Sequence, residues 1–105
     1  MKFLVETEVF AEAPVDRLKD LITAQLARRS KGYGESPVKV EAAYGVLGRR
    51  GAVAIVDAPD ADTLQAILVN APLFHFEKMV VTPLVDLPTS LKLMADAAEK
   101  VSKPL

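Results

Sequence analysis

Two carboxylates and a histidine of this 105-residue chain are placed where they could carry acid-base chemistry. Glu6 and Glu8 lie two residues apart in a stretch of alternating apolar and charged residues, so both should project from one face of a strand. His75 is the only histidine and lies close to Glu77, and an imidazole exchanges protons near neutral pH. We therefore predict Glu6, Glu8 and His75 as candidate catalytic residues for proton transfer.

The same residues also have a purely structural interpretation. Glu6 and Glu8 could form cross-strand ion pairs on a wet surface, and His75 could be a hydrogen-bonded junction residue packed between two phenylalanines. A catalytic site on this strand face would also need walls. The polar side chains that could line such a cavity are Lys39, Glu41, Lys78, Thr82 and Asp20.

The composition excludes several kinds of site. Cysteine is absent, which rules out disulfides, thiolate metal sites and thiol nucleophiles. One histidine without a suitable cluster of carboxylates gives no metal-ligand set. Gly45, Gly48 and Gly51 belong to a hairpin and lack the following helix that a phosphate-binding loop needs. We expect neither a metal nor a cofactor.

The charge pattern bears on partners and location. The net charge is −1 with acidic and basic residues interspersed, so no basic patch is available for nucleic acid or an anionic membrane. No apolar run approaches the ~20 residues of a membrane-spanning helix. The N-terminal stretch MKFLVETEVF lacks the continuous apolar segment of a secretory signal. These features predict a cytoplasmic protein.

Periodicity predicts the elements that would position these side chains. Apolar residues alternate with charged ones in the strands and recur at helical spacing in the helices. The predicted elements are a strand over residues 2–10, a helix from residue 14 to 32 or 34, and a hairpin over residues 38–57. A second helix over residues 61–71 and a last strand over residues 76–86 follow. This order, β-α-β-β-α-β, predicts one ferredoxin-like α+β domain over residues 1–105, with both helices on one face of an antiparallel sheet.

A helical tail is predicted for residues 88–105. Pro88-Thr89-Ser90 should cap an amphipathic helix. The apolar positions of that helix are Leu91, Met94, Ala98 and Val101. Just before the tail, Pro83 lacks an amide donor, which predicts that the last strand lies at an edge of the sheet or carries a bulge.

Two helices would cover only one face of the sheet. Strict alternation places Tyr44 on the covered face, together with Val40, Ala42 and Val46. The uncovered face would carry Leu4, Glu6, Glu8, Lys39, Glu41, Ala43, Leu47, Lys78, Val80, Thr82 and Leu84. Either this face stays open and half-wet, or two subunits join their faces into a barrel whose partly polar interior holds a ligand. In the second case the terminal helix could reach across to the partner.

The run from Gly48 to Leu91 resembles the muconolactone isomerase family. The matching motifs include Gly48 before a strand, Asp57-Ala58-Pro59 after it, and Pro72-Leu73-Phe74 after the second helix. Further matching positions are Leu64, Leu68, Pro88, Thr89 and Ser90, and in the first strand Phe3, Val5 and Val9. The remainder of the chain matches in the order of its elements.

This resemblance implies a dimeric α+β barrel, often assembled further, and a cofactor-independent enzyme that moves a proton between carbons of an unsaturated lactone. The family's proposed base is a carboxylate in the first helix, but residues 21–27 contain none, and the nearest candidates are Asp20, Gln25 and Lys19. We therefore predict an isomerase of a lactone or a related aromatic-breakdown product. The alternative is a non-catalytic member that binds a small organic acid or serves as an assembly module.

Overall fold

The computed structural model describes residues 1–30 and 36–102 of the chain. Its elements are β1 (Lys2–Val9), α1 (Val15–Ser30), β2 (Lys39–Gly45), β3 (Gly51–Asp57), α2 (Ala61–Leu68), the short 3-10 helix η1 (Phe74–Phe76), β4 (Glu77–Leu84) and α3 (Leu87–Ser102). The predicted order of strands and helices is confirmed. The end of α1 that we predicted at Gly32 or Gly34 lies outside the described residues.

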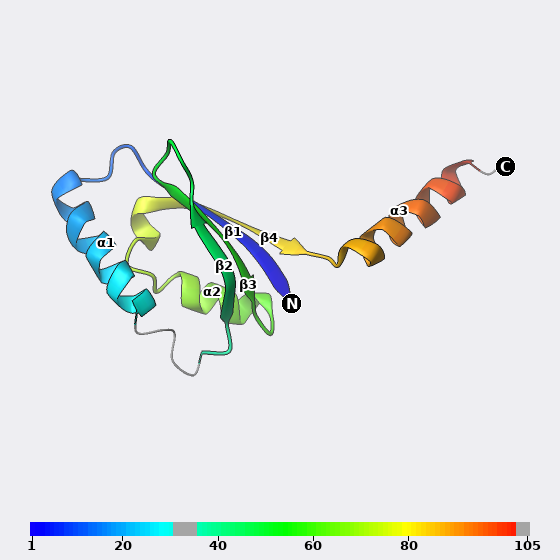
Figure 1. The fold of residues 1–105 in the computed structure, drawn as a ribbon, viewed down its shortest axis with the longest axis horizontal. Coiled ribbons are helices and arrows are strands. Elements are labelled where there is room, and N and C mark those ends of the chain that lie inside the picture. Colours follow the sequence, from blue (N-terminus) through cyan, green and yellow to red (C-terminus); the bar gives the residue numbers. More distant parts are fainter. Residues whose placement is uncertain (31–35, 103–105) are drawn as a thin grey trace.

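The four strands form one antiparallel sheet in the order β2-β3-β1-β4. Both α1 and α2 lie on the same side of this sheet, while α3 projects away from the end of β4 (Figure 1). The predicted α+β architecture is therefore confirmed. β4 is an edge strand, as predicted from Pro83, which has no amide donor.

A bulge in β2 changes which side chains face the helices. The register between β2 and β3 shifts between Val40 and Ala42, so Glu41 is an extra residue. Beyond the bulge, Tyr44 pairs with Val53, which in turn pairs with Glu6 on the uncovered face. Tyr44 is 69% exposed there. Our placement of Tyr44 on the covered face was wrong, because one extra residue reverses every later side chain.

Three neighbouring predictions were also wrong, two because of the bulge and one because β2 ends at Gly45. Ala42 pairs with Ile55 and lies on the uncovered face, whereas Ala43 pairs with Ala54 and faces the helices. Leu47, which we placed on the sheet, lies in the turn beyond β2 and is fully exposed. Compared with strict alternation, the uncovered face consequently gains the Tyr44 ring and loses Leu47.

The core lies between the sheet and α2. Its buried residues are Phe3, Val5, Val38, Val56, Ala58 and Leu64. Asp60 fixes the start of α2, because its carboxylate accepts a hydrogen bond of 2.7 Å from the Thr63 amide. The same hydrogen bond lowers the pKa of Asp60. Within residues 15–28 of α1, Leu18 is the buried residue, and its apolar neighbours Ile22 and Leu26 remain largely exposed.

The start of α3 differs from the prediction. The Asp86 carboxylate accepts hydrogen bonds from the Thr89 amide at 3.3 Å and the Thr89 hydroxyl at 3.1 Å. The helix cap is thus Asp86, not the predicted Pro88-Thr89-Ser90, and Leu87 begins the helix.

Gly51 marks a close approach between β3 and β1. A Cβ atom at Gly51 would overlap the backbone carbonyl oxygen of Thr7. Gly51→Ala should therefore lower the free energy of unfolding by about 1–3 kcal/mol, because both strands are held by ladder hydrogen bonds. Gly45→Ala is the matched control, since a Cβ there meets no atom within 4 Å. Equal urea-unfolding midpoints for the two variants would contradict this packing.

Candidate functional site

A cavity of about 610 Å³ lies between α1, α2 and the covered face of the sheet. Its apolar wall includes Val5, Val56, Leu64, Ile67, Leu68 and Met79. The cavity exists because Ile22 and Leu26 of α1 line it without filling it. A largely apolar cavity of this size is typical of small-molecule sites in proteins.

Four polar side chains converge on this cavity from three elements. Thr7 comes from β1, Gln25 and Arg28 from α1, and Glu77 from β4. The side-chain carbonyl oxygen of Gln25 is buried and has no hydrogen-bond partner among the described residues. Arg28 donates a hydrogen bond of 3.4 Å to the Ile67 carbonyl oxygen, which ties α1 to α2. A few oriented polar groups in an apolar wall give a site its specificity.

Glu77 is the carboxylate that the sequence interpretation missed. It is the first residue of β4, lines the cavity and is about half buried. Burial raises the pKa of Glu77 above that of an ordinary glutamate, because the charged form loses solvation. The signal was present in the sequence, since Glu77 lies two residues before Met79 and must share its face of the strand.

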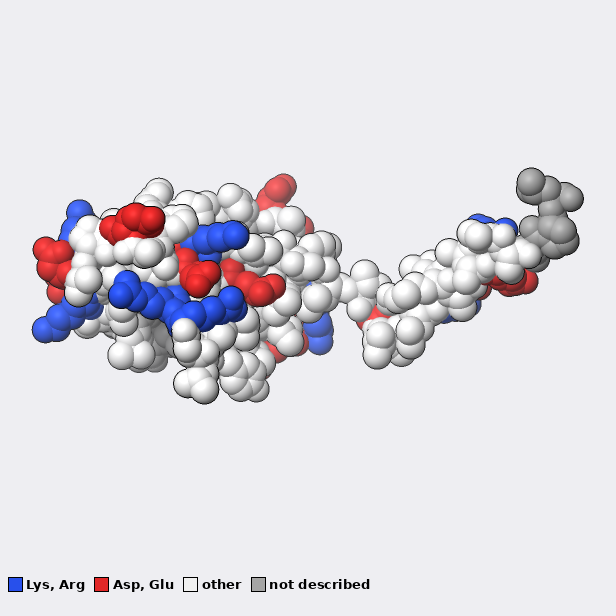
Figure 2. Space-filling model, turned by 90° about the horizontal axis from the view of Figure 1, so that it is seen from above, with Lys and Arg blue, Asp and Glu red and all other residues white. Residues whose placement is uncertain are grey.

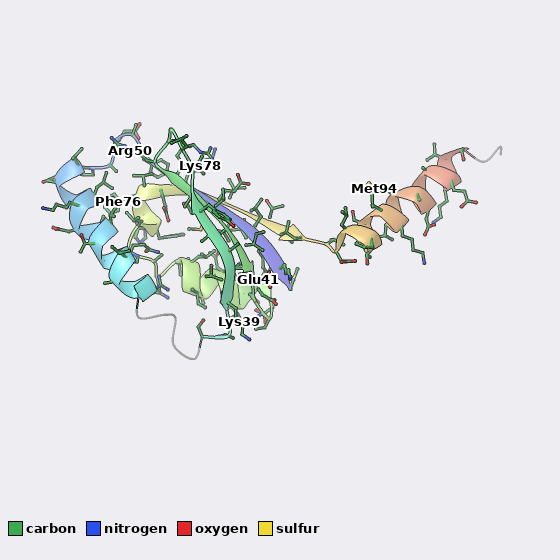
Figure 3. The ribbon with its side chains drawn as sticks, in the orientation of Figure 1. Lys39, Glu41, Arg50, Phe76, Lys78 and Met94 are labelled. Carbon is green, nitrogen blue, oxygen red and sulfur yellow. The ribbon has the colours of Figure 1, made fainter. Side chains whose placement is uncertain are left out.

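The η1 turn fixes the position of Glu77. The Phe76 amide donates to the Leu73 carbonyl oxygen at 2.9 Å, and the Phe10 amide donates to the Phe76 carbonyl oxygen at 2.9 Å. The Arg17 guanidinium lies 5.7 Å from the centre of the Phe76 ring, a cation-π contact that joins α1 to the turn. Figure 3 shows Phe76 between α1 and the end of the sheet. Glu77, which follows Phe76, is therefore held at the cavity wall.

His75 lies on the outside of the same turn. Its ring packs edge-to-face on Phe74, with centroids 5.2 Å apart and an interplanar angle of 78°. The side chain is exposed and does not line the cavity. We predicted that the last strand begins at residue 76, but Phe74–Phe76 forms a 3-10 helix and β4 begins at Glu77. The packing suits the junction role, and the catalytic role of His75 stays a prediction.

Glu6 and Glu8 lie on the uncovered face of the sheet. Glu8 borders a surface groove together with Arg49, Arg50 and Lys78. Figure 2 shows acidic and basic side chains interspersed at this end of the molecule. Register places Lys78 directly opposite Glu8 and Val80 opposite Glu6. The cross-strand ion pairs of Glu6 and Glu8 stay a prediction.

The other predicted site residues are spread over the molecule. Lys39 and Glu41 lie at the opposite end of the sheet from Lys78 (Figure 3). Glu41 forms an ion pair of 3.1 Å with the Lys2 ammonium. Thr82 is exposed on β4, and Asp20 is exposed on α1. None of the eight residues that we predicted for the site lines the cavity beneath α1.

The raised pKa of Glu77 has a consequence for stability. An unfolded chain gives Glu77 its ordinary pKa, so the folded chain binds more protons in the pH range between the two values. Folding stability should thus fall as the pH rises through this range. Glu77→Gln should be more stable than the wild type at neutral pH, and the difference should vanish in acid. Thermal unfolding of both proteins across pH checks this, and parallel pH curves would contradict it.

Residues 1–30 and 36–102 also bear on the predicted absence of a cofactor and on the predicted location. No group of three or more potential metal ligands occurs in these ranges. No helix in them is both long and apolar enough to cross a membrane. The predicted absence of a cofactor and the predicted cytoplasmic location stay predictions.

Comparison with known proteins gives a consistent picture. The family described as muconolactone delta-isomerase matches residues 1–90. No curated protein sequence matches the chain. A crystal structure of muconolactone isomerase superposes with a TM-score of 0.67 at 18% sequence identity, covering 87% of this chain and 95% of that chain. At this identity the superposition establishes a shared fold. Most of α3 lies beyond the matched residues.

Proposed function

Because the chain belongs to the muconolactone delta-isomerase family, we propose that it is a cofactor-independent isomerase of a small unsaturated lactone or a related aromatic-breakdown product. The observation that supports this most is the half-buried Glu77 in the wall of an apolar cavity. A carboxyl whose pKa is raised towards neutral can both take and return a proton.

The proposed reaction moves one proton between two carbons. The Glu77 carboxylate removes a proton from the carbon next to the lactone carbonyl, and the electrons of the C–H bond pass to the carbonyl oxygen to form an enolate. The protonated Glu77 then returns the proton to a different carbon of the conjugated system, and the carbonyl re-forms. The carboxylate is regenerated, so the cycle needs no oxidant, reductant or metal.

Arg28 is suited to hold the negative charge of the enolate. Its guanidinium lies in the cavity wall and is anchored on the Ile67 carbonyl oxygen. A fixed positive charge in an apolar site stabilises a developing oxyanion without having to reorganise. The buried Gln25 carbonyl oxygen is an acceptor that needs a donor, which favours a substrate carrying a hydroxyl group.

A binding protein without catalytic activity is the competing proposal. It is favoured by one observation: α1 contributes Ile22, Gln25, Leu26 and Arg28 to the cavity but no carboxylate. Ultraviolet absorbance with muconolactone, beside a thermal-shift assay with the same compound, separates the two functions. Turnover supports the isomerase, whereas a thermal shift without turnover supports the binding protein. Neither signal would reject muconolactone as a ligand.

A catalytic site on the uncovered face remains a second location for the isomerase. Glu6 and Tyr44 lie on that face and could act as a base and a hydrogen-bond donor if a second subunit closed over them. This arrangement would retain the roles predicted for Glu6 and Glu8, whereas His75 lies in η1, before the sheet resumes at Glu77. It also requires the homo-oligomer that the family resemblance implies, whereas the cavity beneath α1 is formed within one chain.

A further inference from the structure

A second cavity, here called the side cavity, adjoins the cavity beneath α1. Its volume is about 560 Å³, and it lies between the first half of α1 and the hairpin end of the sheet. Five residues line both cavities, namely Thr7, Ile22, Ala52, Leu73 and Glu77. The two cavities therefore meet beside Glu77, and a ligand at this carboxylate has room to extend in both directions.

Two basic side chains line the side cavity. Lys19 comes from α1, and Arg50 from the turn before β3. Neither forms an ion pair with an acidic residue in the part of the chain that the structure describes. The Val9 amide donates a hydrogen bond of 2.8 Å to the Arg50 carbonyl oxygen, which fixes the backbone of Arg50 at the end of β1. Figure 3 shows Arg50 at the end of the sheet opposite to Lys39. Two such cations favour an anionic group on the ligand.

The rest of the side cavity is mostly apolar. Its apolar wall consists of Val9, Val15, Leu18, Ile22, Ala52 and Leu73. Lys19 and Arg50 are exposed, so an anionic group beside them keeps part of its water. Moving that group into an apolar wall would cost far more free energy, whereas an apolar chain gains free energy there. The arrangement suits a ligand with an anionic head at the rim and an apolar body inside.

The two cavities together are long. Along β3, the side cavity begins at Gly51 and the cavity beneath α1 ends at Val56. These residues are about 16 Å apart, because a strand rises about 3.3 Å per residue. A single lactone ring fills only part of this length. A ligand that fills it needs an extended body.

We infer that the ligand is an elongated acid, with its carboxylate at Lys19 and Arg50 and its apolar body extending past Glu77 into the cavity beneath α1. The Arg50 guanidinium can hold a carboxylate through two parallel N–H donors, and Lys19 adds a second positive charge. For the isomerase, the substrate class is then an unsaturated lactone with a long apolar side chain that ends in a carboxylate. The inference rests on the proposed function in taking the cavity beneath α1 as the ligand site.

Isothermal titration calorimetry with straight-chain acids tests the apolar body. Butanoate, hexanoate and octanoate differ by two methylene groups at each step, and each step should raise the affinity by about tenfold because the added groups are buried. Octan-1-ol has the length of octanoate without its charge and should bind at least about tenfold more weakly than octanoate. Equal affinities of the three acids, or of octanoate and octan-1-ol, would overturn the inference.

The variant Lys19→Gln with Arg50→Gln tests the anionic head. It should bind octanoate about tenfold or more weakly than the wild type and octan-1-ol with unchanged affinity. The matched control is Arg49→Gln with Lys92→Gln, which loses the same charge at exposed residues that line neither cavity. The control should bind octanoate like the wild type. Unchanged octanoate affinity in the first variant would place the acid elsewhere, such as on the exposed apolar residues of α3, and would overturn the inference.

The result is separate from that of the muconolactone assay. Octanoate binding that depends on Lys19 and Arg50, without lactone turnover, supports the inference and rejects the isomerase. Lactone turnover that depends on Glu77, in a wild type that does not bind octanoate, overturns the inference and keeps the isomerase. Thermal unfolding of each variant shows that its fold is intact.

Discussion

Glu77→Gln should reduce lactone turnover by about 10²–10⁴-fold, the usual contribution of a general base. The amide keeps the shape of the side chain but cannot accept the proton. Because Glu77 is half buried and burial already disfavours its charge, the neutral amide should not cost stability. Initial rates by ultraviolet absorbance give the result. Glu12→Gln is the control, since Glu12 is exposed and lines none of the described cavity.

The pH dependence of turnover should also identify Glu77 as the general base. Only the ionised carboxylate can take a proton, so kcat/KM should fall as the pH drops through the pKa of Glu77. Burial raises that pKa, which places the acid limb at a higher pH than an ordinary glutamate would give. An acid limb in the ordinary carboxylate range would count against Glu77 as the base.

Leu64→Ala should have the largest effect on stability, lowering the free energy of unfolding by about 2–5 kcal/mol. Leu64 is 2% exposed and packs in the core beneath the sheet with Phe3 and Val56. The truncated side chain would leave a void next to a cavity that is already present, so few neighbouring side chains could move in to fill it. Urea unfolding measures the loss.

A matched leucine shows whether this loss comes from burial. Leu93→Ala removes the same atoms from an exposed position on α3 and should change the unfolding free energy by less than about 1 kcal/mol. Equal losses in the two variants would mean that α2 is not packed on the sheet as described. Leu64→Ala should also loosen ligand binding, because Leu64 lines the cavity.

The elements of the fold could be predicted because each is set by local chemistry. Alternation identified β1, and the glycines of the hairpin marked the turn between β2 and β3. The second helix ends at Leu68, before the end at residue 71 that we predicted from Pro72. The missing amide of Pro83 correctly indicated an edge strand. These signals depend only on residues close together in the sequence.

The errors came from features that depend on contacts between distant segments. Nothing in the local pattern near Glu41 shows that β3 will pair with a register shift, so Tyr44 was placed on the wrong face. Asp86 acts as a cap only because the chain leaves β4 at that point. Strand alternation cannot show whether a helix packs closely against the sheet, because this depends on packing over the whole sheet.

The candidate site likewise depends on contacts between distant segments, although one signal for it was local. The chemistry expected of the family directed attention to a carboxylate in α1, where Gln25 and Arg28 now line the cavity instead. A carboxylate does reach that cavity, but it comes from β4. Glu77 could have been found by asking which acidic residue shares a strand face with the core residue Met79.

The most direct test of the proposed site compares two variants with the wild type in one muconolactone assay. The first is Glu77→Gln, and the second combines Glu6→Gln, Glu8→Gln and His75→Gln. Catalysis in the cavity beneath α1 predicts that the first variant loses turnover and the combined variant keeps it. An active Glu77→Gln beside an inactive combined variant would contradict this account and place the chemistry at the residues predicted from the sequence.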